Sequence, residues 1–182
     1  MFINECVAPE RMQEVLDVID EHDEVVGQAP RPECHRDMLR HRAIQIFVFD
    51  EHGNIFVQRR SKSKDSYPGM LEASCAGHVQ SGEAYRQAAA RELAEELGIT
   101  HQEHELKELF RFKLRAAPEH ELVAQFSIKC TCTGKLQKGE VESGSFVPWD
   151  EFVRRVEKNP QEFTPATVAA LQLFQKNAGA RI

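Results

Sequence analysis

The sequence predicts one globular unit of the α/β or α+β class. Three observations support this: several short apolar segments of strand length, two or three segments with helical periodicity, and no low-complexity tract or interior linker in 182 residues. We expect residues 1–182 to form one domain. Residues 1–40 would be an N-terminal extension with a β-hairpin and a short helix, and residues 41–178 would be the core.

The N-terminal extension is expected to begin with paired strands. Residues 14–27, EVLDVIDEHDEVVG, consist of two β-like runs around a polar turn at 21–23. Pro30 and Pro32 are expected to interrupt regular structure. A short polar helix over 33–40 would then lead into the core.

The core is expected to open with a tight hairpin. Residues 43–50, AIQIFVFD, are rich in β-branched and aromatic side chains, and residues 50–54 form a polar turn before a second run at 55–58. A polar loop follows over 61–67, and residues 70–76 are expected to be extended.

A helix is predicted to end at Leu97, because Gly98 suits a left-handed cap. Ala89, Leu93 and Leu97 are four residues apart and form its buried stripe. The remaining elements are expected in chain order as strands over 105–114 and 122–132, a turn over 134–139, a short strand over 145–149, a helix from 149 to about 157 and a last helix over 165–178. In the first of these strands, Phe110 and Phe112 are expected in the core rather than at a ligand pocket.

The composition excludes two classes of function. A net charge of −6 provides no basic field for nucleic acid. The longest apolar runs, such as residues 44–49, are too short to cross a bilayer, and the N-terminus lacks the apolar region of a signal peptide. Five cysteines without a C-x-x-C pair are expected to be reduced thiols, which favours a cytoplasmic location.

Three carboxylates, Glu92, Glu95 and Glu96, are predicted to converge within one turn of the helix. They repel one another, and they lie near the negative end of the helix dipole. Arg91 is the only basic residue between positions 87 and 99, so we expect no internal salt-bridge partners for the cluster. A solvated acidic face is the alternative, but a Mg²⁺ ion, or Mn²⁺ in its place, would remove the conflict.

Glu83 precedes Arg91 by eight residues, a separation of roughly 12 Å along a helix. If the two side chains interact, Glu83 must therefore lie in a preceding loop that turns back. Gly77 and Gly82 give that loop its conformational freedom.

These residues resemble the signature of the Nudix hydrolases. The match is Gly77, five residues, Glu83, seven residues, and the run RELAEELGI from 91 to 99. The resemblance implies an α/β/α sandwich with a mixed β-sheet and a loop–helix–loop metal site. It also implies Mg²⁺-dependent hydrolysis of a diphosphate linked to another group. In that interpretation Glu92, Glu95 and Glu96 bind the metal and act in catalysis.

Other positions receive roles from the same resemblance. Arg91 and Glu83 would orient the loop and the helix. Gly77, Arg60 and Lys64 are the expected substrate-binding residues. Independently of the resemblance, Arg60 and Lys64 lie directly before the metal loop of a net-acidic chain, which favours a diphosphate clamp over a solvated basic edge of the sheet. The candidates for a general base outside the signature are Glu119, Glu121, Glu140 and Glu142.

The flanking sequence is similar to a second group, the isopentenyl diphosphate isomerases, which share the Nudix fold. The similar positions are His41-Arg42-Ala43, Gln58-Arg59-Arg60, Lys64, Tyr67-Pro68-Gly69, Gly77-His78 and Glu119-His120-Glu121. This resemblance implies a second metal site at His41, His78, Glu119 and Glu121. Hydrogen-bonding histidines beside a pocket are the equally weighted alternative.

The chain departs from the isomerase pattern at two places. Ala76 occupies the position of the isomerase's catalytic cysteine, and Cys75 lies one residue early, which on a strand turns its side chain to the opposite face. A further metal histidine of that family is replaced by Cys34, with His35 beside it.

Three hypotheses remain: a Mg²⁺-dependent diphosphate hydrolase, which we favour, an isomerase of allylic diphosphates, and a ligand sensor without catalysis. In each the partner is a small diphosphate-containing molecule rather than a nucleic acid or a membrane. A homodimer is left open.

Overall fold

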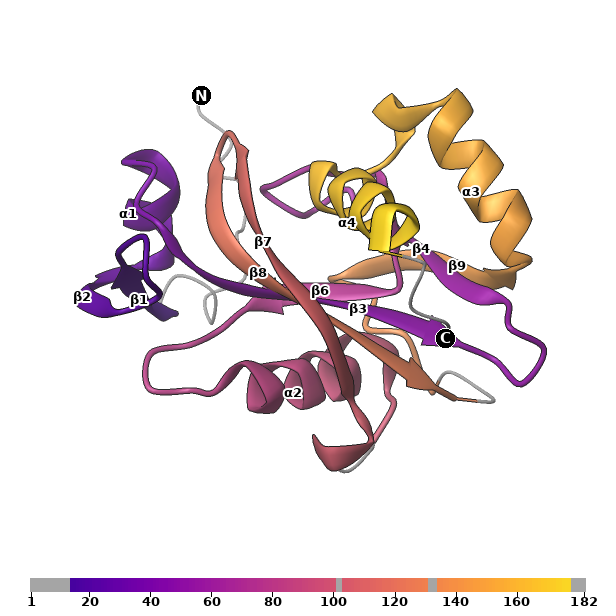
Figure 1. Ribbon diagram of the computed structural model, residues 1–182, viewed down its shortest axis with the longest axis horizontal. Coiled ribbons are helices and arrows are strands. Elements are labelled where there is room, and N and C mark those ends of the chain that lie inside the picture. Colours follow the sequence, from indigo (N-terminus) through magenta and orange to yellow (C-terminus); the bar gives the residue numbers. More distant parts are fainter. Residues whose placement is uncertain (1–13, 101–102, 131–133, 178–182) are drawn as a thin grey trace, which may run out of the picture.

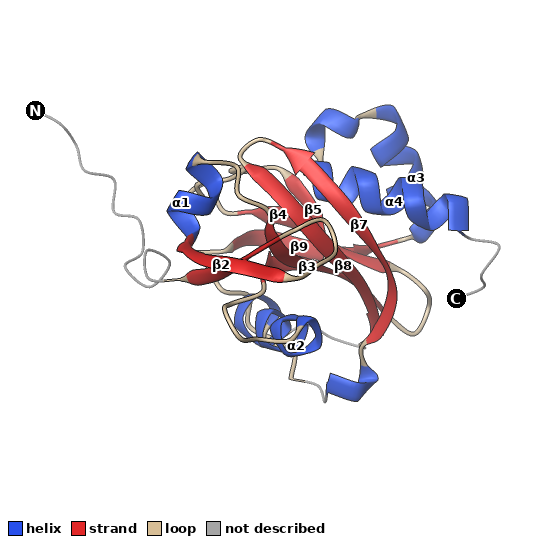
Figure 2. Ribbon diagram, turned by 60° about the vertical axis from the view of Figure 1, so that its left-hand side comes forward, coloured by secondary structure: helices blue, strands red, loops and turns tan. Residues whose placement is uncertain are grey.

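The computed structural model describes residues 14–100, 103–130 and 134–177, and its centre is a mixed β-sheet between helices (Figures 1 and 2). The helix α2 covers one face of the sheet, and α3 and α4 cover the other. The fold is therefore of the α+β class with helices on both faces, as the sequence predicts. The strands are β1 Val15–Ile19, β2 Val25–Pro30, β3 His41–Phe49, β4 Ile55–Arg60, β5 Leu71–Ala73, β6 Cys75–His78, β7 Lys107–Ala116, β8 Glu119–Lys129 and β9 Val141–Val147. The helices are α1 Arg31–Arg36, α2 Tyr85–Leu97, α3 Trp149–Lys158 and α4 Pro165–Asn177, with short 3-10 helices at Glu103–Glu105 and Pro160–Glu162.

Strand β3 is the centre of the sheet. Along one edge it pairs in parallel with β8, from His41 opposite Glu121 to Phe49 opposite Lys129. Its other edge is shared by β1, β6 and β4, all antiparallel to it. The mixed sheet thus places the ends of β3, β6 and β8 beside one another.

The predicted hairpin of β3 and β4 forms only at its tip. Phe49 opposite Ile55 is the single register pair between the two strands. The strand β6 occupies the edge of β3 from Ala43 to Ile46, so β4 diverges and pairs with β5 and β9 instead. The predicted strand, turn and second strand are thus present, and the pairing between the two strands is confined to the tip.

The apolar residues form one core on each face of the sheet. One lies between the sheet and α2, where Ala89, Leu93 and Leu97 are fully buried. Gly98 has φ 63°, which confirms the left-handed cap. The other core lies against α3 and α4, and it includes Phe112, with Phe110 partly buried beside it. The prediction is confirmed for Phe112, whereas Phe110 is only partly buried and lines a separate pocket with Phe49 and Phe174.

The N-terminal extension continues the same sheet, because β1 pairs with β2 and, at Val18, with His41 of β3. The short helix α1 covers 31–36 rather than 33–40. Pro32 lies inside its first turn, where a missing N–H is tolerated, so it does not break the helix. Met38 has φ 53°, a conformation that ends the helix early.

Later elements differ from expectation mainly at their ends. The strands β7, β8 and β9 are shifted by two to four residues from the predicted ranges 105–114, 122–132 and 145–149. The chain at 134–137 is irregular, and a turn forms at 138–140 instead of over the whole of 134–139.

The division into an extension at 1–40 and a core at 41–178 stays a prediction. Within the described ranges, every helix is too short or too polar to span a lipid bilayer.

Candidate active site

A pocket of about 390 Å³ lies between α2, the end of β6 and the start of β8. Its wall contains all three glutamates of α2 and four arginine and lysine side chains, which are Arg31 of α1, Arg60 of β4, Lys64 of the following loop and Arg91 of α2. The charged residues that line it include Arg31, Arg60, Lys64, Glu92, Glu95, Glu96, Glu119, Glu121 and Glu140. Acidic and basic side chains that line the same cavity suit an anionic ligand that binds together with a metal ion.

The three glutamates of α2 have different environments. Glu92 and Glu96 are buried, whereas the Glu95 side chain is 56% exposed. Burial, with the charge of Glu96, raises the pKa of Glu92 to about 7. Burial also raises the pKa of Glu96, but the Lys64 charge and a hydrogen bond from Gln58 outweigh it and lower this pKa overall. The result is a pair of adjacent buried carboxylates that differ in proton affinity.

The expectation that this cluster lacks salt-bridge partners is wrong. Arg91 Nη1 lies 2.6 Å from Glu92 and 3.3 Å from Glu95. Lys64 Nζ lies 3.1 Å from Glu96 and 2.7 Å from Glu140. The second partner comes from a loop 32 positions away in sequence, so helical spacing could not reveal it.

Arg91 also connects the helix to the loop that precedes it. Its Nε and Nη2 each donate to Glu83 at 2.9 Å, and Nη2 donates to the His78 carbonyl at 3.0 Å. Glu83 lies just before α2, so the predicted loop that turns back is present. Arg91 and Glu83 thereby fix the position of the loop against the carboxylates.

Gly77 lies directly against Glu92. A Cβ atom on residue 77 would overlap the Glu92 carboxyl group and lie only 2.7 Å from its Cγ. The missing side chain at Gly77 therefore leaves the space in which the Glu92 carboxylate lies.

Three basic residues of the pocket wall, Arg31, Arg60 and Lys64, are buried and paired. Arg60 Nη1 donates to Glu72 at 2.8 Å, and Lys64 bridges Glu96 and Glu140. Arg31, at the start of α1, makes two hydrogen bonds to Asp65 at 2.5 and 2.8 Å. Sequence reasoning selected Arg60 and Lys64 but missed Arg31, because nothing in its local sequence places it near the signature.

The candidate bases fall into two groups. Glu119, Glu121 and Glu140 line the pocket, whereas Glu142 is exposed on β9 and is not among the described residues that line it. Burial, together with the Glu121 charge, raises the pKa of Glu119 to about 8. Burial raises the pKa of Glu121 as well, but the facing His41 and His78 rings outweigh burial and lower it.

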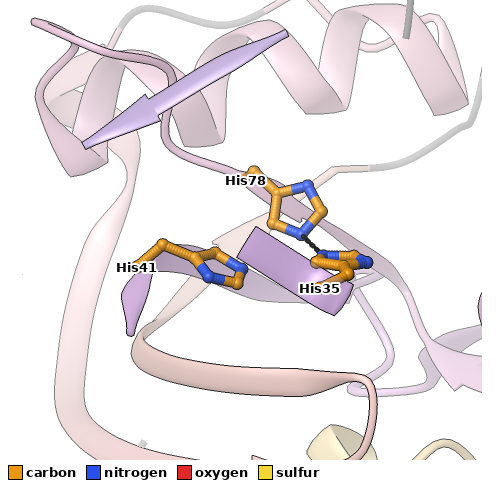
Figure 3. A group of neighbouring side chains, drawn as sticks. All are labelled: His35, His41 and His78. Carbon is orange, nitrogen blue, oxygen red and sulfur yellow. Dashed lines mark hydrogen bonds between the residues drawn. The ribbon is translucent and has the colours of Figure 1, made fainter. Parts of the chain in front are cut away.

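A cluster of three histidines lies at the same end of the sheet (Figure 3). The structure brings His41, His78 and Glu121 together, since Glu121 Oε1 lies 3.6 Å from His41 Nε2 and 3.5 Å from His78 Nε2. His35 of α1 completes the cluster, and its Nε2 lies 3.3 Å from that of His78. Glu119 lies on the pocket wall beside this cluster.

The ionisation of the cluster is asymmetric. Burial, with the neighbouring His78, lowers the pKa of His35 to about 3. Burial would also lower the pKa of His78, but Glu121 and Glu14 outweigh it and raise this pKa to about 9. Sequence reasoning placed His35 only as the neighbour of Cys34. The signal that could have identified it is its position, one residue from a site where a metal ligand was expected.

The isomerase nucleophile has no counterpart in the pocket. Ala76 lines the pocket, while Cys75 is fully buried in the core beneath the sheet with Ile44 and Leu93. Burial raises the pKa of the Cys75 thiol well above its usual value. This agrees with the predicted opposite orientation of Cys75.

The carboxylates of α2 fit a hard divalent cation. Glu92, Glu95 and Glu96 offer oxygen donors, and Gly77 leaves room beside the first of them. Arg91 and Lys64, the cations that contact them, each have another carboxylate partner in Glu83 or Glu140. The glutamates could therefore turn to a metal without leaving a buried base unpaired.

The sequence comparison agrees with this geometry. Residues 39–167 match the NUDIX domain family. The chain belongs to the Nudix hydrolase family. This membership implies pyrophosphohydrolase activity on a small diphosphate-containing substrate, and Nudix proteins typically depend on a divalent metal.

Two uncharacterised relatives are similar to this Nudix protein over most of both chains. An uncharacterised Nudix hydrolase of Yersinia pestis is 36% identical over 91% of this chain and 88% of the relative. The uncharacterised Nudix hydrolase YfcD of Escherichia coli K12 is 37% identical, over 90% of this chain and 87% of YfcD. Isopentenyl-diphosphate Delta-isomerase 2 of Photorhabdus laumondii is 42% identical but over only 48% of this chain and 50% of the isomerase.

A solved structure supports the fold. The crystal structure of DR0079 from Deinococcus radiodurans superposes on this Nudix protein with a TM-score of 0.67 and 28% identity. The match covers 80% of this chain and 90% of DR0079. The similarity to the isomerases is therefore partial, whereas the Nudix fold accounts for most of the chain.

Proposed function

We propose that this Nudix protein is a Mg²⁺-dependent hydrolase that cleaves a diphosphate linkage in a small nucleoside- or organic-diphosphate substrate. Mn²⁺ is expected to replace Mg²⁺. The observation that carries the proposal is the pair of buried carboxylates, Glu92 and Glu96, in a pocket whose wall also holds Arg31, Arg60 and Lys64. Acidic residues for a cation and basic residues for phosphate oxygens are thereby available in one cavity.

The pocket residues would have separate roles in the reaction. Glu92, Glu95 and Glu96 would hold Mg²⁺, which when bound neutralises charge that develops on the phosphate oxygens. Arg60 and Lys64 would orient the diphosphate.

Arg91 and Glu83 would keep the loop and helix in register around Gly77, and so hold the pocket in shape. Glu119, Glu121 and Glu140 are within the pocket wall and remain the candidates for a general base.

The two alternatives have less support. An isomerase would need a nucleophile or acid at position 76, where this chain has Ala76, and Cys75 is enclosed by the core. A sensor without catalysis could lose signature carboxylates, yet Glu92, Glu95 and Glu96 are all present. The unbridged, buried thiols of Cys34 and Cys75 suit the reducing cytoplasm, which we propose as the location.

A phosphate-release screen tests the function. Purified protein would be assayed with Mg²⁺ or Mn²⁺ against nucleotide sugars, dinucleoside polyphosphates, coenzymes, oxidised nucleotides and isoprenoid diphosphates. We expect turnover of one substrate class, and a loss of at least about a hundredfold in Glu96→Gln with the fold retained. Lys64 keeps Glu140 as a partner in that variant, so its charge stays compensated.

The matched control is Glu142→Gln, since Glu142 is exposed and lies outside the described pocket wall. It should hydrolyse substrate at the wild-type rate. A screen without any turnover, or full activity in Glu96→Gln, would refute the proposal. Interconversion of isoprenoid diphosphates without phosphate release would instead identify an isomerase.

A further inference from the structure

The loop over residues 61–70 joins β4 to β5 and carries Lys64. The Lys64 side chain is 6% exposed, and its Nζ lies 3.1 Å from Glu96 and 2.7 Å from Glu140. Residues 61–70 form turns and bends rather than a helix or a strand. The position of the Lys64 ammonium group therefore depends on what holds this loop.

The loop backbone has an unusual conformation at Tyr67. Its φ is 50°, in the left-handed region that residues with side chains rarely adopt, whereas Gly69 adopts its φ of 74° readily because it lacks a Cβ. A conformation such as that of Tyr67 persists only where surrounding contacts hold it. Contacts from other elements must therefore keep the loop in place.

Two of these contacts come from the sheet. Arg60 Nη2 donates to the Ser66 carbonyl at 2.9 Å, and the Tyr67 hydroxyl donates to the Ala116 carbonyl at 2.9 Å. Both contacts hold the loop after residue 65. Asp65, the neighbour of Lys64, is held by a partner in the N-terminal extension.

That partner is Arg31 of α1, which makes a bidentate ion pair with Asp65. Its Nη1 donates to Oδ2 at 2.5 Å, and its Nη2 donates to Oδ1 at 2.8 Å. Because both carboxylate oxygens face one rigid guanidinium plane, the pair fixes the orientation of Asp65 as well as its distance. Asp65 Oδ1 also accepts a hydrogen bond from the Ser66 amide at 2.9 Å, which connects the carboxylate to the loop backbone.

Arg31 is itself held by Glu14. The Arg31 amide donates to the Glu14 carbonyl at 2.8 Å, and Arg31 Nε lies 3.8 Å from Glu14 Oε2. Burial lowers the pKa of Arg31, but Asp65 and Glu14 outweigh burial and raise it, so the guanidinium stays charged. Both Nη groups thus face Asp65 and the Nε faces Glu14, an arrangement that suits a residue that orients the loop.

We propose that Arg31 is a positioning residue that acts through Asp65 to hold the loop, and with it the Lys64 ammonium group, against Glu96. This role rests on the proposed function, in which Lys64 orients the diphosphate of the substrate. Arg31 and Asp65 lie outside the Nudix signature at 77–99 and outside the positions shared with the isomerases. The N-terminal extension is thereby part of the substrate site as well as of the sheet.

Direct binding of phosphate by Arg31 is the competing role, because Arg31 also lines the pocket. The two roles differ in their dependence on Asp65, which is not among the described residues that line the pocket. If Arg31 acts through Asp65, loss of either partner has the same effect. If Arg31 contacts the substrate, loss of Asp65 leaves that contact in place.

Hydrogen exchange and lysine labelling of the substrate-free protein test the position of the loop. We expect Arg31→Met to speed both amide exchange in residues 61–70 and acylation of Lys64 by an N-hydroxysuccinimide ester at least about tenfold, because both report opening of the loop. Asp65→Ala should give the same increase, and the double variant should add nothing to it. Exchange in α2 should stay at the wild-type level, which shows that the fold is retained.

Two further variants make the test specific. Arg36→Met should leave both rates unchanged, since Arg36 is an exposed arginine of the same helix that pairs with its neighbour Asp37. Arg31→Lys should give intermediate rates, because an ammonium group keeps the charge and loses the bidentate geometry. The Asp65 side chain is 43% exposed, so Asp65→Ala is expected to fold even if Arg31→Met does not. Wild-type rates in Asp65→Ala, or in a folded Arg31→Met, would overturn the proposal.

Steady-state kinetics with the substrate that the phosphate-release screen identifies separate positioning from direct contact. Arg31→Met should raise KM at least about tenfold with a smaller fall in kcat. In a Lys64→Met background the same substitution should have little further effect, because the group that it positions is gone. An undiminished effect in that background would show direct contact and refute the positioning role. A wild-type protein that turns over no substrate would refute the hydrolase function alone, and the exchange and labelling rates would still decide whether Arg31 holds the loop.

Discussion

Gly77 and Glu92 are in direct contact across the loop and the signature helix, and the space that a Cβ would fill at residue 77 is occupied by the Glu92 carboxyl group. The glycine of the signature therefore has a steric role toward a proposed metal ligand. Its φ is not positive, so a backbone requirement does not explain it.

Gly77→Ala should displace the Glu92 carboxylate and lower kcat and Mg²⁺ affinity by about ten- to a hundredfold, the range for residues that position ligands. The measurement is a Mg²⁺ titration of hydrolysis. Gly27→Ala is the control, because a Cβ there meets nothing within 4 Å. Unchanged Mg²⁺ dependence in Gly77→Ala would contradict the steric role.

Arg91→Lys should destabilise the protein by about 1–3 kcal/mol, since one ammonium cannot replace the guanidinium contacts to Glu83, Glu92 and the His78 carbonyl. Urea unfolding measures this free energy, and kcat should fall as well. Arg36→Lys should have no effect, because Arg36 is exposed and its ion pair with the neighbouring Asp37 lies at the surface. Equal stability of the two variants would refute the prediction.

Cys75→Ala should leave hydrolysis intact and cost about 1 kcal/mol of stability, because it removes one buried sulfur from the core beside α2. The native thiol should also react with alkylating reagents far more slowly than after unfolding, since burial raises its pKa. A loss of all activity in Cys75→Ala with a normal fold would instead support a mechanism in which the Cys75 thiol takes part.

Asp17→Asn should destabilise the protein at neutral pH by about 1–3 kcal/mol. Burial raises the pKa of Asp17, but hydrogen bonds and the Arg42 charge outweigh it and bring the pKa below 3.8. The donors are Ser81 Oγ at 2.7 Å, Gln28 Nε2 at 3.1 Å and the Gly82 amide at 3.2 Å.

A folded pKa below the unfolded value means that the stabilisation is present above pH 3.8 and is lost as the pH falls through the folded value. The difference between Asp17→Asn and wild type should therefore shrink below about pH 4. Urea unfolding at several pH values measures it, and a difference that is constant down to pH 2 would contradict the assignment.

Local patterns in the sequence predicted the signature helix well. The spacing of Ala89, Leu93 and Leu97 fixed its buried face, and Gly98 fixed its end, because a helix is determined by residues three and four apart. The loop position of Glu83 followed from the same geometry.

Contacts between distant segments could not be predicted in this way. The Lys64 contact to Glu96 and the His35 contact to His78 join residues 32 and 43 positions apart. Their proximity depends on the sheet register and on how α1 lies over it, neither of which leaves a periodic signal. The same register limited the β3–β4 hairpin to its tip.

The parallel pairing of β3 with β8 has a consequence for biosynthesis. His41 and Glu121 are about 80 residues apart, so at 5–20 residues per second the ribosome delivers β8 roughly 4–16 s after β3. During that interval the apolar strand from Ile44 to Phe49 lacks its longest partner, and the helices α3 and α4, which cover one face of the sheet, are made later still. The nascent chain is therefore expected to need a chaperone, and the yield of folded protein should respond to chaperone supply more than to codon changes after residue 129.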